Sequence, residues 1–259
     1  MIKITSIVII ISYISVIETQ MEPKVVGGNK ASITDFPHSV FIGVSCIEED
    51  SRKKVGWICG ASILNVKVLL TAAHCMHRCS PQSFIGVCVG HADRKAGYSA
   101  SVHSFIVHEL YSNLRVDYDI GLLRLRTPLE LNKKVTKVAL MRDPPYYEKA
   151  QIAGWGMLNE FTQEMGTKLM FIDQYVWKGD RCKEVITNQP KGTICASSGD
   201  PTTYSSRGDS GSALVVRGYI QIGIVSYKVP KISRSLVVYT DTGYFYDWIT
   251  HNTKRLYCA

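Results

Sequence analysis

Short apolar runs interrupted by turn residues form the main pattern between about residue 38 and residue 243. The runs are rich in Val, Ile, Leu and Tyr, and Gly, Pro, Asn or Asp bound them, which is typical of β-strands. Examples fall in the ranges 38–46, 66–75, 83–90, 120–129, 150–156, 212–227 and 234–243. Many strands at such short spacing predict a sandwich or a barrel.

The C-terminal segment 244–257 has a different period. Phe245, Trp248, Ile249 and Leu256 recur at roughly helical spacing, which predicts one amphipathic helix. The pattern as a whole therefore predicts an all-β chain that ends in a helix.

The first residues have the features of an export signal. Lys3 precedes an apolar run from Ile7 to Ile17, which is too short to span a bilayer. We expect a signal peptide over residues 1–20, a secreted extracellular protein and no membrane partner, because no later run is long and apolar enough to cross a bilayer. The eight cysteines suit an oxidising compartment, where disulfides persist.

Composition narrows the function only a little. The 259 residues are 46% hydrophobic and 20% charged, which is ordinary for a globular protein with one large or two modest domains. The net charge is +8, but the basic residues are scattered and lack a basic-aromatic pattern. A solvated basic surface is favoured over a nucleic-acid partner.

Four motifs occur together in one order: "LTAAHC" (70–75), "DYDIGLLRL" (117–125), "GWG" (154–156) and "RGDSG" (207–211). With these motifs the chain resembles the trypsin/chymotrypsin-like serine proteases from Val25 to its C-terminus. The resemblance implies two antiparallel Greek-key β-barrels, about 25–140 and 141–259, packed together with a C-terminal α-helix. A lone "GDSG" would be a weak signal, and the joint occurrence carries the inference.

The resemblance implies a role for each matching residue. His74 is the expected general base, Asp119 orients it and Ser210 is the nucleophile. Asp117 precedes Asp119 by two residues, and the match to the motif favours Asp119. The backbone N–H groups of Gly208 and Ser210 are the expected oxyanion hole. Six other histidines have no motif around them and are expected to be structural or exposed: His38, His77, His91, His103, His108 and His251.

The segment "MEPKVVGG" (21–28) resembles the activation junction of the same family. The resemblance implies a propeptide over residues 21–24 and cleavage after Lys24 by a protease of tryptic specificity. The freed amine of Val25 is then expected to pair with Asp209, because an isolated buried carboxylate is costly. We therefore expect a zymogen.

The resemblance also implies two disulfides, Cys59–Cys75 and Cys182–Cys195. Cys46, Cys79, Cys88 and Cys258 allow three further pairings, which the sequence leaves open, although a pair within the first half is plausible. Ser206 stands where trypsin-like enzymes have a cysteine that closes the mouth of the pocket. Its usual partner is missing too, which indicates a divergent pocket.

The specificity pocket departs from the tryptic pattern. Tyr204 takes the floor position that Asp occupies in trypsin-like enzymes, so Arg and Lys would lose their charge partner. Ser226 matches the family's serine beside the substrate backbone. After it, Tyr227 and Lys228 replace Trp-Gly, and Val237 replaces the glycine of the opposite wall. These side chains predict a shallow pocket that prefers small or apolar residues, unless Lys228 is an exposed lysine that swings clear.

These observations predict a secreted serine endopeptidase acting through a His-Asp-Ser triad and an acyl-enzyme intermediate. The alternative is a protease-like binding or regulatory protein with an occluded pocket. We expect protein or peptide substrates, protein protease inhibitors as further partners, a monomer, no cofactor and no metal.

Overall fold

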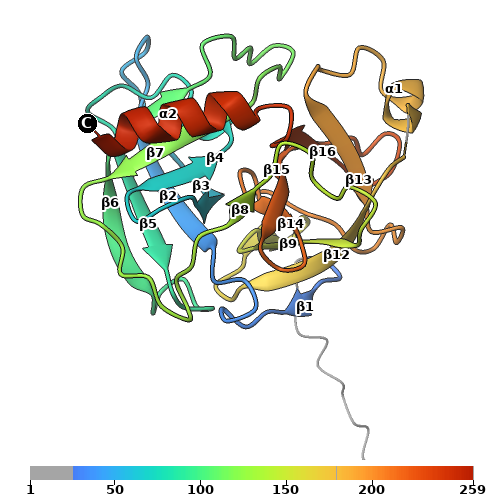
Figure 1. The fold of residues 1–259 in the computed structure, drawn as a ribbon, viewed down its shortest axis with the longest axis horizontal. Helices are drawn as coiled ribbons and strands as arrows, with labels where there is room; N and C mark the ends of the chain where they lie inside the picture. Colours follow the sequence, from blue (N-terminus) through green and yellow to red (C-terminus); the bar gives the residue numbers. More distant parts are fainter. Residues whose placement is uncertain (1–25, 179, 259) are drawn as a thin grey trace, which may run out of the picture.

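Two β-barrels packed side by side form the molecule, with one helix across the first barrel (Figure 1). The computed structural model describes residues 26–178 and 180–258. The expected signal peptide, propeptide and activation residues Lys24 and Val25 lie outside these ranges. The predicted fold class, two antiparallel barrels with a C-terminal helix, is confirmed.

The first barrel is a closed ring of six strands in the order β2-β3-β4-β7-β6-β5. Burial alternates along β2, as expected for a strand with one face on the core. The bounds are β2 Ser39–Ile47, β3 Lys54–Ile63, β4 Val68–Thr71, β5 Phe84–Val89, β6 Tyr98–Val107 and β7 Gly121–Leu125. The 3-10 turn η1 (Ala73–Cys75) directly follows β4.

The second barrel closes through a β12–β9 pairing in the order β12-β13-β16-β15-β14-β9. Its strands are β9 Ala150–Gly154, β12 Met170–Val176, β13 Thr193–Ser197, β14 Ala213–Val216, β15 Ile220–Lys228 and β16 Leu236–Asp241. The short strands β1 (Asn29–Lys30) and β8 (Ala139–Leu140) add to this sheet. A hairpin of β10 (Met157–Asn159) and β11 (Glu164–Met165) projects beside it.

The predicted C-terminal helix is α2 (Tyr246–Cys258), and it lies against the first barrel (Figure 1). Its residues Ile249 and Leu256, and Phe245 just before it, join the core of that barrel. A second, short helix, α1 (Arg181–Val185), has no apolar periodicity from which it could be expected. Among the residues that the structure describes, no helix is long and apolar enough to cross a membrane.

Three disulfides are formed within the described residues. Two of them, Cys59–Cys75 and Cys182–Cys195, are the pairs that the resemblance implies. The third, Cys46–Cys79, resolves the open pairing within the first half, because β2 and the loop after η1 bring the two cysteines together. Cys88 is buried and free, and Cys258 is exposed and free.

Candidate active site

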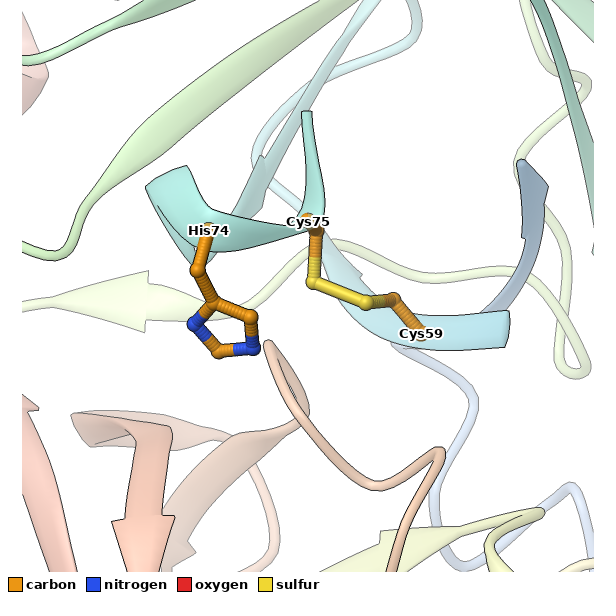
Figure 2. A group of neighbouring side chains, drawn as sticks. All are labelled: Cys59, His74 and Cys75. Atoms are coloured by element: carbon orange, nitrogen blue, oxygen red, sulfur yellow. A yellow bond between two sulfur atoms is a disulfide. The ribbon is translucent and has the colours of Figure 1, made fainter. Parts of the chain in front are cut away.

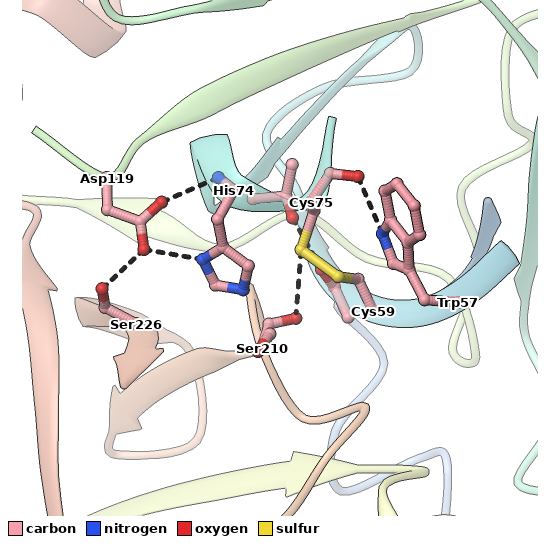
Figure 3. Close-up of a disulfide and its surroundings, with 9 residues drawn as sticks. Trp57, Cys59, His74, Cys75, Asp119, Ser210 and Ser226 are labelled. Atoms are coloured by element: carbon pink, nitrogen blue, oxygen red, sulfur yellow. Dashed lines mark hydrogen bonds and ion pairs between the residues drawn. A yellow bond between two sulfur atoms is a disulfide. The ribbon is translucent and has the colours of Figure 1, made fainter. Parts of the chain in front are cut away.

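His74 and Asp119 meet at the edge of the first barrel, which faces the second. His74 lies on η1, and Asp119 lies just before β7, which pairs with the strand that leads into η1. Its Oδ1 accepts the backbone N–H of His74 at 2.9 Å, and its Oδ2 lies 2.8 Å from His74 Nδ1 (Figure 3). The carboxylate therefore fixes both the position and the orientation of the imidazole.

The second barrel anchors Asp119 from the other side. The Ser226 hydroxyl donates to Asp119 Oδ2 at 2.5 Å, and the Thr240 hydroxyl donates to the Asp119 carbonyl at 2.8 Å. The side chain of Asp119 is only 1% exposed. The hydrogen bonds from Ser226, from Thr240 and from the His74 backbone thus satisfy the polar atoms of a residue that is withdrawn from water. Ser226 was expected beside substrate, and this link to Asp119 could not be anticipated.

Burial and the charge of Asp119 shift the pKa of His74 in opposite directions. Burial lowers the pKa of the His74 imidazole, but the charge of Asp119 and its hydrogen bond more than offset this effect, so the pKa is raised above its ordinary value. The imidazolium is thus stabilised where it would form when His74 takes a proton.

Ser210 lies on a loop that backbone hydrogen bonds hold against both barrels. Its carbonyl accepts the Gly60 N–H at 2.7 Å, and the N–H of Gly211 donates to the Val225 carbonyl at 2.8 Å. Figure 3 draws Ser210 next to the His74 ring, and Cys75 Sγ is 3.8 Å from the Ser210 carbonyl oxygen. Within the described residues the Ser210 hydroxyl makes no hydrogen bond to His74.

Gly208 and Ser210 offer two free backbone donors. In the part of the chain that the structure describes, neither N–H donates to a protein acceptor. Gly208 has φ +98°, and an added Cβ would lie 2.7 Å from Ile58 Cδ1, so only glycine fits. Two unpaired N–H groups on adjacent turns are what an oxyanion needs.

Asp209, between them, is fully buried. Its Oδ1 accepts the Gly156 N–H at 2.9 Å and its Oδ2 accepts the Ser206 N–H at 2.8 Å. Burial raises its pKa to about 6, against the lowering effect of these two hydrogen bonds and of the Lys228 charge. No ion pair joins Asp209 to a cation among the described residues.

The "GWG" motif explains how Asp209 fits. An added Cβ at Gly154 would lie 2.2 Å from Asp209 Oδ1, and one at Gly156 would lie 2.4 Å from Oδ2. Both glycines therefore make room for the carboxylate, a role that the motif alone does not reveal.

The first residues that the structure describes, Val26 and Gly27, lie next to Tyr204, the expected pocket floor. The Val26 carbonyl accepts the backbone N–H of Tyr204 at 3.1 Å, and an added Cβ at Gly27 would lie 2.5 Å from the Thr202 carbonyl oxygen. The segment that follows the expected cleavage point thus packs on the loop that leads to Asp209.

The predicted pocket residues come together on β15, β16 and the loop before Ser210. Tyr204 is 4% exposed and Val237 is fully buried. Lys228 pairs with Val237 across β15 and β16, and Tyr227 pairs with Val238. The Lys228 ammonium lies 4.8 Å from the centroid of the Tyr204 ring and 2.5 Å from Glu160 Oε1. Lys228 therefore does not swing clear of the pocket.

One cluster of potential metal ligands occurs in the described ranges, formed by Cys59, His74 and Cys75 (Figure 2). The two sulfurs are joined in a disulfide, so neither is a thiolate that could bind a metal. The disulfide instead fixes η1, which carries His74, to β3.

Comparison with known proteins agrees with this geometry. The family model described as Trypsin matches residues 25–249. The chain belongs to the trypsin family. This family of serine proteases acts on protein substrates, and within it the chain is 30% identical over 240 residues to Hypodermin-B of Hypoderma lineatum, covering 91% of this chain and 90% of that relative.

Two further similar proteins extend the comparison. Trypsin eta of Drosophila erecta is 29% identical over 247 residues, covering 91% of this chain and 92% of that relative. The crystal structure of scabies mite inactivated protease paralogue S-D1 superposes with a TM-score of 0.75 at 25% identity, covering 88% of this chain and 97% of that one.

Proposed function

We propose that this trypsin-family protein is a secreted serine endopeptidase that acts through His74, Asp119 and Ser210. The observation that carries the proposal is the pair of hydrogen bonds by which buried Asp119 holds the His74 backbone and ring beside the Ser210 loop.

The mechanism follows from the positions of the groups. His74 takes the proton of the Ser210 hydroxyl as its oxygen attacks a peptide carbonyl, and an acyl-enzyme forms when His74 returns the proton to the leaving amine. Asp119 stabilises the imidazolium, in agreement with the raised pKa of His74. The N–H groups of Gly208 and Ser210 stabilise the oxyanion, and water then releases the acyl group.

The protein is made as a zymogen. Asp209 is buried with two backbone donors and no cation paired to it in the described residues, so its ionised form is costly. The Val26 carbonyl accepts the Tyr204 N–H, so the segment that directly follows the expected cleavage point packs on this loop. Cleavage after Lys24 by a protease of tryptic specificity supplies the Val25 amine as the missing partner of Asp209.

Its specificity is not tryptic. The Tyr204 ring and the buried Val237 side chain occupy space that a long substrate side chain would need, and the Lys228 ammonium repels Arg and Lys. Small or apolar residues at the cleavage position are therefore preferred.

The direct test is cleavage of a mixed peptide library by protein that has been matured at Val25. Ser210→Ala is the control, because loss of the nucleophile removes about 10⁶ of the rate. We expect Ser210-dependent cuts, none of them after Arg or Lys. Cuts after Arg or Lys would show that Lys228 and Tyr204 do not form the pocket. Matured protein that cleaves nothing would overturn the endopeptidase and favour a binding role.

A further inference from the structure

The Lys228 ammonium is turned into the protein and needs an anion. Its side chain is only 22% exposed, and its Nζ lies over the Tyr204 ring and against the Glu160 carboxylate. A cation that is largely withdrawn from water is costly unless a counterion accompanies it. Some carboxylate must therefore occupy this position whenever Lys228 points inward.

The carboxylate of Glu160 is held by groups from three separate segments. Its Oε1 accepts from Lys228 Nζ at 2.5 Å and from the Ser206 hydroxyl at 3.1 Å. The positive charge of Arg234 acts on it as well. Together these groups outweigh burial, which by itself raises the pKa of Glu160, so that the pKa is lowered. They form a carboxylate receptor made of Tyr204, Ser206, Lys228 and Arg234.

The receptor adjoins the catalytic residues on two segments. Ser206 precedes Ser210 by four residues, and the Ser206 N–H donates to Asp209. Lys228 follows Ser226 by two residues, and Ser226 donates to Asp119. The donors thus lie on the two chain segments that also carry the nucleophile loop and the support of the triad.

Glu160 reaches the receptor from a different kind of element. It lies in the turn of the β10–β11 hairpin, whose next residue, Phe161, is 87% exposed. Ser206 and Tyr204, by contrast, are 6% and 4% exposed. An exposed turn can move away from the receptor without disturbing the core. Ser206 and Lys228 would then stay in place, and the Lys228 ammonium would still require a counterion.

We propose that this site binds an acidic side chain of the substrate, preferably Asp, at the residue whose carbonyl Ser210 attacks, and that Glu160 occupies the site in the free protein. This inference rests on the proposed function and refines its small-residue preference. Tyr204 and Val237 limit the depth of the pocket, so a short side chain fits. Its carboxylate replaces that of Glu160 on Lys228 and Ser206, so no buried charge loses its partner.

The test uses protein matured at Val25 and four peptides that differ only in Asp, Asn, Ala or Lys at the cleavage position. We expect kcat/KM to be about tenfold or more higher for Asp than for its isostere Asn, because a hydrogen bond to a charged group contributes about 1.5–3 kcal/mol. Lys228→Gln should abolish the Asp preference. Glu160→Gln should raise kcat/KM for the Asp peptide several-fold by removing the internal competitor.

Glu164→Gln is the matched control, because it removes a carboxylate from the same hairpin that does not pair with Lys228. It should leave the four rates unchanged. Equal rates on the Asp and Asn peptides, or faster cleavage after Ala, would overturn the carboxylate receptor while the endopeptidase stands.

A second measurement separates the two proposals if no peptide is cut. Binding of the Asp and Asn peptides to Ser210→Ala protein, followed by fluorescence anisotropy, does not require catalysis. Tighter binding of the Asp peptide that is lost in Lys228→Gln would support the receptor even without endopeptidase activity. Equal binding of the two peptides, or no binding, would refute it.

Discussion

Asp119 is the residue whose contacts most constrain the chemistry. It links the first barrel to the second, because it accepts from His74 on one side and from Ser226 on the other. The position of its carboxylate therefore depends on how the two barrels are aligned, and it in turn sets the orientation of the His74 ring.

We predict that Asp119→Asn lowers kcat by about 10⁴ with the fold unchanged, since the amide favours the wrong imidazole tautomer. The raised pKa of His74 means that activity is lost as pH falls through a value above the ordinary 6.5. Without the charge of Asp119, burial remains as the main effect on the pKa of His74 and lowers it, so the residual activity should persist to lower pH. Profiles of kcat/KM against pH measure both effects.

Asp117→Asn is the matched control for this prediction. Asp117 lies two residues away and pairs with Arg115 at the surface, not with His74. It should keep nearly full activity and an unchanged pH profile. A large loss in Asp117→Asn, or none in Asp119→Asn, would assign the orienting role to the wrong carboxylate.

At the scale of the elements, the loop that carries Asp209 depends on the turn after β9. The loop can fold only because Gly154, the last residue of β9, and Gly156, in the turn after it, leave room for the carboxylate. The glycines of the "GWG" motif thus pack directly against the Asp209 carboxylate of the "GDSG" motif.

We predict that Gly156→Ala destabilises the protein by about 1–3 kcal/mol, the usual cost of an overpacked site, and reduces activity by displacing Asp209. Gly56→Ala on β3 is the control, because its Cβ would meet the Val44 carbonyl oxygen at an ordinary 3.4 Å. Urea unfolding and peptide cleavage measure the two effects. Equal stability and activity of the two variants would contradict the contact.

How far the sequence predicts this molecule differs between its parts. Eight of the twelve barrel strands fall in the short apolar runs, whereas β3, β6, β12 and β13 lie outside the runs named. The family motifs identify His74, Asp119 and Ser210 because each is embedded in a longer pattern. The contact of Glu160 with Lys228 joins residues that are 68 positions apart, and no periodicity relates them. The Cys46–Cys79 pairing could not be singled out for the same reason. The short helix α1 was not predicted because its sequence has no apolar periodicity.

At the scale of the whole molecule, the proposed activation would couple the segment at Val26 to the loop before the nucleophile. With no cation paired to it in the described residues, Asp209 has a folded-state pKa of about 6, against 3.8 for an ordinary Asp. A folded pKa that is raised means stability that is present below pH 4 and is lost as pH rises through about 6.

We predict that an uncleavable Lys24→Gln precursor loses on the order of 3 kcal/mol of unfolding free energy between pH 4 and pH 7 relative to the same precursor with Asp209→Asn. Urea unfolding at several pH values measures the difference. The buried His38, whose pKa is lowered to about 4, is common to both proteins and cancels. After cleavage at Val25 the loss should disappear. If the unfolding free energies of the two precursors changed with pH in parallel, ionisation of Asp209 would not be destabilising.

The position of α2 has a consequence for the order in which the molecule can be completed. Phe245, Ile249 and Leu256 belong to the core of the barrel that is built from residues 39–125. During synthesis, residues 39–125 leave the ribosome first, and these three core residues leave it only after the strands of the second barrel. Until then the first barrel exposes the apolar face that α2 later covers. The two barrels therefore complete their folding together.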